Sequence, residues 1–342
     1  MKIIECVPNL SEGKNKTSLE KIKDSLNGIP DCRLLNFEPD IDYNRVVITF
    51  TGNEIRILEG ALAISRIAAK EIDMRNHKGE HPRIGAIDVV PFIPIKNTSI
   101  EECIKISELY GKIISEELNI PVYLYESSAK VPDRINLSNI RKGEYEGLQE
   151  KLKDENWKPD FGKREFNPKL GAIVTGARFF LIAYNVNIQS SDIKYAKEIS
   201  ELIRESGIPK KDKDGNPIKI DGQIIRETGR LKNVKGMGVK LEKYNITQVS
   251  MNLTNYNITP LHVAFEEIKK EAERLGVKIS GSEIVGLVPL EALLQAGKYY
   301  AHNQNMDESS LLDLAVENLG LNDLRPFNKK EKIIDYLIKD FV

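Results

Sequence analysis

The chain has 342 residues, 41% of them hydrophobic and 30% charged, and its formal net charge is −1 at pH 7. This composition excludes a disordered protein, and the near-zero charge gives no field that would draw the chain to nucleic acid or an anionic membrane. Three cysteines are too few for a disulfide framework, and neither a signal peptide nor an apolar run of transmembrane length occurs. We therefore expect a cytoplasmic protein of two domains.

The first half of the chain predicts a β-α-β-β-α-β succession. Asn53 can cap the second helix, and Thr98-Ser99-Ile100-Glu101 reads as a capping box for a third. A short loop joins the second and third strands, an arrangement typical of a ferredoxin-like, antiparallel sheet with helices on one face. Apolar periodicity gives these elements in order: strand 2–7, helix 18–26, strands 32–37 and 46–51, helix 53–68, strand 84–95, helix 98–118 and strand 121–126.

The second half repeats that succession. A polar helix over 138–153 and a loop rich in Pro, Gly and charge over 157–170 separate the halves. We expect an α+β fold of two ferredoxin-like subdomains, 1–170 and 171–342, with a helical tail. The later elements are strands 171–175 and 179–187, helix 192–206, an exposed hairpin over 210–229, strands 239–241 and 246–253, a helix that ends at Gly276, strand 277–288, and tail helices 290–296, 309–319 and 329–338. The helix that ends at Gly276 should start with Thr259 as its N-cap and Pro260 as its first residue.

One stretch, HKGEHPRIGAIDVVPFIP over residues 77–94, concentrates the residue types of a reaction centre. His77 and His81 are two of the four histidines in the chain, with Glu80 between them and Arg83 just after. An apolar run that reads as a buried strand follows directly and would hold the polar loop on a rigid support. The stretch therefore predicts acid/base chemistry by a histidine near neutral pH, and solvated loop histidines are the alternative.

The same stretch matches the H-x-x-E-H pattern of one class of zinc peptidase. That pattern binds zinc on a helix, where residues four apart share a face. Gly79 within it and Pro82 immediately after it disfavour a helix, so we predict no metal site.

The chain resembles the glutamate formiminotransferase family, including the transferase part of formiminotransferase-cyclodeaminase. The resemblance runs over nearly the whole length and is carried by five motifs: ECVPNLSEG (5–13), Asn44-Arg45, HKGEHPRIGA (77–86), GARFFLIA (176–183) and GLVPL (286–290). It implies two ferredoxin-like subdomains. It also implies transfer of the formimino group from N-formimino-L-glutamate to N5 of tetrahydrofolate, with release of L-glutamate, in histidine degradation and one-carbon metabolism.

The resemblance also implies site residues. The catalytic histidine of the family matches His81, which leaves His77 as a structural or supporting residue. Tetrahydrofolate is the implied co-substrate, and no metal is implied. The folate-binding segment of the family matches Gly162, Lys163, Arg164, Glu165, Phe166, Asn167, Pro168, Lys169, Leu170 and Gly171.

Substrate carboxylates need guanidinium or ammonium partners. Arg45, Arg83 and Arg178 each lie in a motif, and with Asn9 they are the candidate substrate-binding residues. A surface ion pair is the alternative for each arginine. In the folate segment, the basic side chains would offer charge and Phe166 an aromatic face to the pterin or aminobenzoate rings. A ligand as long as folate leads us to expect a groove between the two subdomains.

Departures from the family are Glu38, where Asp is common, and the long loop Lys210–Gln223. Because the chain ends at Val342, we expect a stand-alone transferase, acting as a homodimer without nucleic-acid or membrane partners. The alternatives are a glutamate formyltransferase acting on 5-formyltetrahydrofolate and a glycine formiminotransferase, both needing the same base. An RNA-binding module is a further alternative, but the aromatic sheet motif of such modules is absent.

Overall fold

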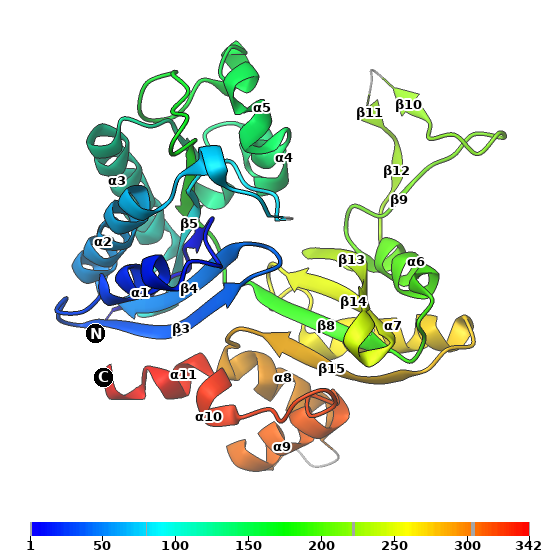
Figure 1. Ribbon diagram of the computed structural model, residues 1–342. Coiled ribbons are helices and arrows are strands. Elements are labelled where there is room, and N and C mark those ends of the chain that lie inside the picture. The colour runs from blue at the N-terminus through cyan, green and yellow to red at the C-terminus, as the bar shows by residue number, and fades with distance from the viewer. Residues whose placement is uncertain (1, 80, 221–222, 302–304, 342) are drawn as a thin grey trace. The chain divides into compact units, whose positions relative to one another are not determined.

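The computed structural model describes residues 2–79, 81–220, 223–301 and 305–341. The chain forms two compact units, Met1–Phe179 and Phe180–Asp340, and each unit contains its own sheet (Figure 1). The first unit thus ends at Phe179, beyond the boundary predicted between Leu170 and Gly171. Segment 173–177 is an interior strand of the first unit's sheet, so the chain leaves that unit only after this strand.

The first unit is built on a seven-stranded sheet. Its strand order is β3 (Cys32–Asp40), β4 (Arg45–Gly52), β1 (Ile3–Cys6) with β2 (Asn9–Leu10), β5 (Ile87–Lys96), β7 (Ile173–Ala177) and β6 (Val122–Leu124). Strands β1 and β2 both pair with β4 and β5 in antiparallel register, so they are two halves of one path interrupted at Pro8. The pairings of β7 with β5 and β6 are parallel, which corrects the expectation of an antiparallel sheet.

Helices cover both faces of this sheet rather than the single face predicted. Helices α1 (Lys16–Asp24), α2 (Glu54–Glu71) and α3 (Ile100–Leu118) share one buried core with the strands, including Phe50, Ile64 and Phe92. Helices α4 (Leu137–Arg141) and α5 (Glu144–Lys151) form a second core with β5, β6 and β7, including Val89, Tyr123 and Leu148. The added strands β6 and β7 supply the surface that this second layer covers.

Local signals set several helix ends. The side chain of Asn53 accepts from the amides of Ile55 and Arg56, as its capping prediction requires. The capping box of α3 joins Ser99 and Glu102, one residue later than the predicted pair. The single helix predicted over 138–153 is split at Gly143, which adopts φ 87°. Short 3₁₀ turns lie at Met74–Asn76, Glu126–Ser128, Pro132–Arg134 and Glu155–Trp157.

The second unit has a four-stranded antiparallel sheet in the order β13 (Val234–Leu241), β14 (Ile246–Leu253), β8 (Ile182–Ile188) and β15 (Ile279–Val285). Helices α6 (Ile193–Ile203) and α7 (Leu261–Arg274) connect its strands. The succession β8-α6-β13-β14-α7-β15 matches β1-α1-β3-β4-α2-β5 in the first unit. In both units the first strand lies between the third and the fourth.

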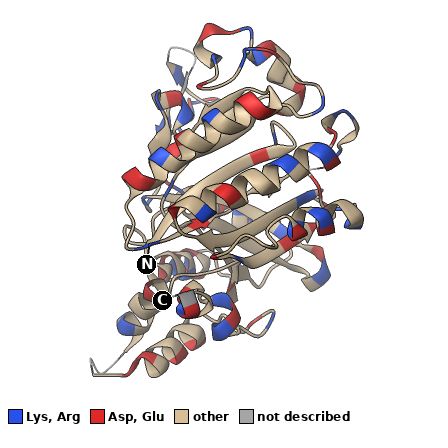
Figure 2. Cartoon of the chain, turned by 90° about the vertical axis from the view of Figure 1, so that its left-hand side faces the viewer, with Lys and Arg blue, Asp and Glu red and all other residues tan. Residues whose placement is uncertain are grey.

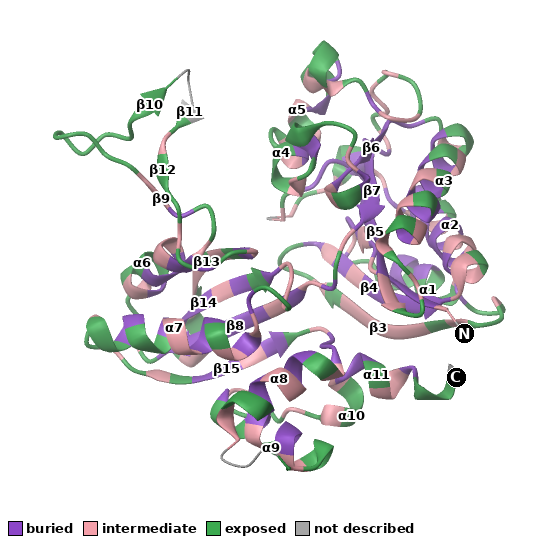
Figure 3. Cartoon of the chain, turned by 180° about the vertical axis from the view of Figure 1, so that it is seen from behind, coloured by how far each residue is buried: buried purple, intermediate pink, exposed green. Residues whose placement is uncertain are grey.

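An exposed hairpin and a helical tail complete the second unit. The predicted hairpin is present in its described residues as the pairs β9 (Ile208–Pro209) with β12 (Arg226–Glu227) and β10 (Lys219–Ile220) with β11 (Gln223–Ile224); Asp221 and Gly222 lie outside the described residues. Figure 3 shows this hairpin as mainly exposed and β5 and β7 as buried. The tail contains α8 (Leu290–Tyr300), α9 (Glu308–Asn318), α10 (Lys329–Lys332) and α11 (Ile334–Leu337), and 3₁₀ turns lie at Glu242–Tyr244 and Lys339–Phe341.

Thr259 does not cap α7 as predicted. Its hydroxyl donates to the carbonyl of Lys232 at 2.6 Å, and Pro260 takes the N-cap position. Acidic and basic residues are mixed along the helices in the view of Figure 2. Within the described part of the chain, no helix has the length and apolar character needed to cross a membrane.

Candidate active site

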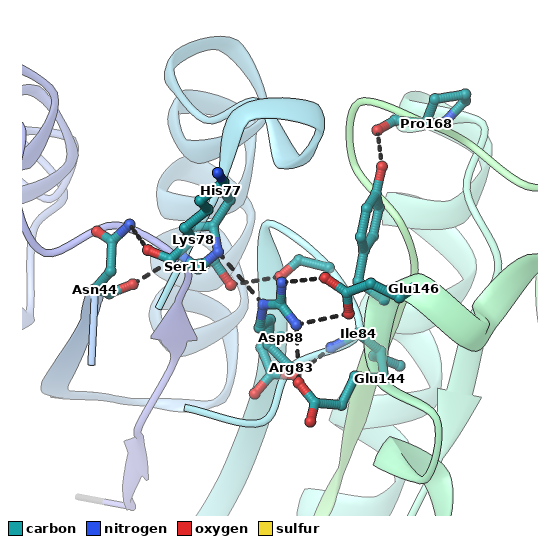
Figure 4. A network of polar contacts seen from close by, with 12 residues as sticks. Ser11, Asn44, His77, Lys78, Arg83, Ile84, Asp88, Glu144, Glu146 and Pro168 are labelled. Carbon is teal, nitrogen blue, oxygen red and sulfur yellow. Dashed lines mark hydrogen bonds and ion pairs between the residues drawn. The ribbon is translucent and has the colours of Figure 1, made fainter. Parts of the chain in front are cut away.

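Asn44 joins three loops of the first unit at the ends of β2, β3 and β5. It lies in the left-handed region at φ 48°, where asparagine is enriched, and its side chain is buried. Its Oδ1 accepts from the Gly13 amide at 3.0 Å, and its Nδ2 donates to the Lys78 carbonyl at 2.9 Å (Figure 4). The loop after β2, the β3–β4 turn and the histidine loop are therefore held together by one amide side chain.

Two glycines allow this close approach. A Cβ on Gly79 would lie 2.4 Å from the Tyr43 carbonyl oxygen, and one on Gly13 would lie 2.1 Å from the Asp40 carbonyl oxygen. Because both neighbours are backbone atoms, a side chain at either position would force the loops apart. Gly79 thus interrupts regular structure, as predicted, and also brings the histidine loop against the β3–β4 turn.

His81 lies against a guanidinium group. Its Nε2 is 2.6 Å from Nη1 of Arg45, and its ring meets the Tyr43 ring edge-on with centroids 6.2 Å apart. Guanidinium can only donate, so Nε2 accepts and Nδ1 carries the proton of the neutral ring. Burial, followed by the charges of Arg45, Arg141 and Arg83, lowers the pKa of His81 to about 3. His81 is therefore neutral at physiological pH.

His77 takes the opposite tautomer. Its Nε2 donates to the Asn44 carbonyl at 2.9 Å, and its Nδ1 accepts from Nε of Arg83 at 3.3 Å. Burial lowers the pKa of His77 as well. Both ring nitrogens are used to connect the β3–β4 turn to Arg83, which supports the prediction of a structural role for this residue.

The arginines near His81 differ in their partners. Buried Arg83 pairs with both oxygens of Glu146 at 2.6 and 2.9 Å and with Glu144 at 2.8 Å (Figure 4). Arg83 was predicted to bind substrate, and an ion pair was the alternative; the structure contains the ion pair. Arg141 pairs with buried Asp88, which also accepts from the Ile84 amide at 3.0 Å. No carboxylate of the described residues pairs with Arg45.

The other two predicted substrate residues lie on neighbouring strands. Asn9 is paired with Val47, two residues from Arg45, so Asn9 and Arg45 share a sheet face. The Nδ2 of Asn9 donates to the Val7 carbonyl at 3.1 Å. Arg178 follows β7, and its Nη1 donates to the Phe179 carbonyl at 2.9 Å. No contact among the described residues joins Arg178 to His81.

The C-terminal end of the predicted folate segment is attached to the histidine loop. The Ala86 amide donates to the Leu170 carbonyl at 2.9 Å, and Gly85 forms a β-bridge with Gly171. Gly171 has φ 68°, and a Cβ there would lie 2.2 Å from the Ile84 carbonyl oxygen. The structure thus brings residues 170–171 beside residues 84–86, which are distant in sequence.

Within the folate segment, some side chains contact other residues and the others are exposed. Phe166 contacts the Tyr145 ring at a centroid distance of 5.5 Å, and the Tyr145 hydroxyl donates to the Pro168 carbonyl at 2.6 Å. Asn167 Oδ1 accepts from two amides of the segment, those of Lys169 and Leu170. Arg164 is engaged by Glu155 and the Leu152 carbonyl, and Lys169 donates to the Lys70 carbonyl. The remaining polar or small residues, Gly162, Lys163 and Glu165, are exposed.

A pocket of about 530 Å³ lies at the His77 end of the loop, lined by His77, Lys78, Gly79, Arg83, Gly143, Glu144 and Glu146. No group of three or more His, Cys, Asp or Glu side chains in the described ranges is placed to hold a metal ion. Glu80 of the H-x-x-E-H pattern lies outside those ranges. Residues 77–79 follow the 3₁₀ turn Met74–Asn76 and are not helical.

Sequence reasoning missed Tyr43, Arg141 and Asp88. Tyr43 stands next to the Asn44-Arg45 motif, so its position was available as a signal. Arg141 and Asp88 are 53 residues apart and carry no motif that would predict their pairing. The pairing of Arg141 with Asp88 is created when α4 packs on the sheet.

The chain matches two family models in succession. The N-terminal subdomain of the formiminotransferase domain matches residues 3–178, and the formiminotransferase domain matches residues 183–339. With both models matched, this chain belongs to the formiminotransferase family.

The chain also matches two kinds of relative, formimidoyltransferase-cyclodeaminases and glutamate formimidoyltransferases. A formimidoyltransferase-cyclodeaminase of Dictyostelium discoideum is 46% identical over 99% of this chain, which spans 61% of that relative. Glutamate formimidoyltransferases of Thermoplasma acidophilum and Streptococcus pyogenes are 42% and 41% identical over 93% and 90% of this chain, and 98% and 95% of their own lengths are covered. The chain thus spans about three fifths of the bifunctional relatives and nearly all of the shorter ones.

Proposed function

We propose that this chain is a glutamate formimidoyltransferase that moves the formimino group from N-formimino-L-glutamate to N5 of tetrahydrofolate, giving 5-formiminotetrahydrofolate and L-glutamate. The observation that carries the proposal is His81, a neutral imidazole whose Nε2 faces an arginine that has no carboxylate partner in the described residues. An acyl-type transfer between two amines needs one group that can accept and then return a proton, and a neutral imidazole does this.

The reaction balances with one base. N5 of tetrahydrofolate forms a bond to the formimino carbon, the carbon–nitrogen double bond of the protonated formimino group opens onto its nitrogen, and the N5 proton passes to Nε2 of His81. This gives a tetrahedral intermediate, and the double bond re-forms when the intermediate collapses. The bond from that carbon to the glutamate nitrogen then breaks, and the imidazolium returns the proton to the leaving amine. No net proton, electron or water is consumed. A general base of this kind contributes roughly 100- to 10,000-fold.

Arg45 is the side chain we assign to a substrate carboxylate. It is half-buried, its pKa is lowered mainly by burial, and no carboxylate of the described residues forms an ion pair with it. An anion brought to this position would supply the missing charge partner. Arg83 supports the loop through Glu144 and Glu146, and Asn9 and Arg178 remain candidates for more distant parts of the ligands.

For tetrahydrofolate we assign residues 162–171. Their attachment at Gly85–Ala86 fixes the segment next to the loop that carries His81. The Tyr145–Phe166 pair offers aromatic surface, and exposed Lys163 offers a positive charge for the glutamyl tail. We also assign both units to the ferredoxin-like class, since each repeats the same strand succession and order. That the chain acts as a cytoplasmic homodimer stays a prediction.

The test is a direct assay of the purified chain. Incubation with tetrahydrofolate and N-formimino-L-glutamate should give one L-glutamate and one formiminofolate per turnover, measured by mass spectrometry and by the folate absorbance spectrum. Parallel reactions with N-formiminoglycine, and with 5-formyltetrahydrofolate plus L-glutamate, should be slower by an order of magnitude or more. Faster turnover in either parallel reaction would assign the substrate differently, and no turnover in any of them would refute the proposal.

A further inference from the structure

Three arginines place positive charge on His81, and two of them are already paired. Arg83 is held by Glu144 and Glu146, and Arg141 by Asp88. Arg45 has no ion-pair partner in the described ranges, and its Nε is buried without a hydrogen-bond partner. The negative charges of Asp40 and Asp88 attract the Arg45 guanidinium only at longer range, and the positive charge of Arg141 repels it. Arg45 is therefore the cation of this group with unused binding capacity.

The unpaired guanidinium donates instead to the nitrogen that the reaction needs. With Nη1 of Arg45 2.6 Å from Nε2 of His81, the imidazole lone pair is already accepting a hydrogen bond. A proton from a substrate cannot reach that lone pair while the donor stays in place. This contact holds the base in the correct tautomer with its lone pair occupied.

A carboxylate is a stronger acceptor for guanidinium than a neutral imidazole, because it adds an opposite charge and offers two oxygens that match the planar fork in a bidentate pair. The Tyr43 ring lies under the Arg45 guanidinium at 5.7 Å and beside His81. A planar guanidinium can turn over such a surface without losing its contact. Moving Arg83 or Arg141 in the same way would require breaking an existing ion pair, so Arg45 alone can exchange partners at low cost.

We propose that Arg45 gates His81: a carboxylate of the bound substrate draws the guanidinium away from Nε2, so that His81 becomes an available base only when the site is filled. This inference rests on the proposed function for the identity of the carboxylate and deepens it. Arg45 is then a positioning and gating residue as well as a binding residue. The substrate class is an amino-acid dicarboxylate, and the proton acceptor is released by the same contact that recognises it.

The experiment follows the His81 imidazole by NMR in ¹⁵N-labelled full-length protein, with its signals assigned through H81N. In the free protein, we expect Nδ1 to carry the proton and no titration of His81 above pH 5. Saturating L-glutamate should raise the pH of the His81 inflection, while burial, the main cause of the low pKa, keeps it below the ordinary histidine value of about 6.5. Glutarate, with two carboxylates and no amine, should do the same, and uncharged glutaramide should not.

Variants separate the gate from simple burial. R45Q should show the inflection without any ligand, and L-glutamate should no longer move it. R66Q is the matched control, because Arg66 pairs with Glu117 between α2 and α3 and should leave the titration of His81 as in the unaltered protein. If R45Q is unstable, R45K takes its place in the test. R45K retains the charge without the planar fork, and its inflection should lie between that of the unaltered protein and that expected for R45Q.

Two results would overturn the gate. One is a His81 whose titration in R45Q coincides with that in the unaltered protein, because burial with Arg141 and Arg83 would then be sufficient. The other is saturable binding of L-glutamate, seen at other residues, with His81 unmoved. If L-glutamate and glutarate do not bind at all, the substrate of the proposed function is refuted, and the ligand-free comparison of R45Q with the unaltered protein still decides whether Arg45 controls His81.

Discussion

The two ends of the histidine loop place the same side chain in opposite roles. At one end, His77 donates to the Asn44 carbonyl and accepts from Arg83, whose charge is neutralised by Glu144 and Glu146. At the other end, His81 accepts from Arg45, whose charge is not neutralised by a described carboxylate. The first end is a closed network with both ring nitrogens used, whereas at the second the imidazole contacts a guanidinium that has no ion-pair partner in the described residues. The neighbours of an imidazole, not its position in a motif, therefore decide whether it supports structure or can move a proton.

Replacing the two histidines one at a time gives the largest expected difference. H81N should lower kcat by roughly 100-fold or more, because asparagine cannot accept the N5 proton, while folate affinity and folding are retained. H77N should lower kcat less. Steady-state kinetics with tetrahydrofolate binding measured separately would show this. Near-full turnover in H81N together with a large loss in H77N would reverse the assignment of the two ends.

The closed network can be opened at its carboxylates. The double variant E144Q/E146Q removes the ion-pair partners of Arg83, a buried guanidinium, and should lower the free energy of unfolding by about 1–3 kcal/mol. E150Q is the control, since Glu150 makes an exposed pair with Lys153 on the same part of the chain and should change stability by less than about 1 kcal/mol. Urea denaturation measures both. Equal effects would mean that Arg83 does not depend on its two carboxylates.

The pH dependence of stability tests the environment of His81. Its pKa is about 3 in the folded protein and near 6.5 when unfolded, so unfolding takes up a proton between these values. Its contribution to stability is fully present above pH 6.5 and is lost as the pH falls toward 3, at up to about 1.4 kcal/mol per pH unit. H81N should therefore lose less stability than the unaltered protein between pH 6.5 and pH 5. Parallel denaturation curves at the two pH values would check this, and identical losses would place the His81 pKa near its ordinary value.

The smallest effect is expected in the folate segment. K163A removes an exposed charge and should weaken tetrahydrofolate binding by about 1 kcal/mol, or about five-fold, without a change in unfolding. R164A should instead lower stability, because Arg164 ties the segment to Glu155 and the Leu152 carbonyl. Isothermal titration and thermal unfolding separate the two effects. Loss of folate binding in R164A alone, at unchanged stability, would exchange the two assignments.

Local patterns were sufficient for most of the elements. The glycines and prolines of the histidine loop predicted a non-helical segment before a buried strand, and the strand β5 begins at Ile87, after the start of the predicted strand at residue 84. The cap at Asn53 and the hairpin after Ile208 also follow from residues close in sequence. The capping signal at Thr259 failed, because a tertiary acceptor at Lys232 competes for its hydroxyl.

The amino-acid sequence by itself determined the order of the elements, the loop with His77 and His81, and the resemblance that singles out His81 and residues 162–171. The parallel addition of β7 and β6 beside β5, the second helical layer and the partners of each arginine were decided only by the tertiary structure. The physical reason is distance along the chain: Arg45 and His81 are 36 residues apart, and Arg83 and Glu146 are 63 apart. Charge pairing over such separations depends on which strands and helices pack together, and no local periodicity encodes it.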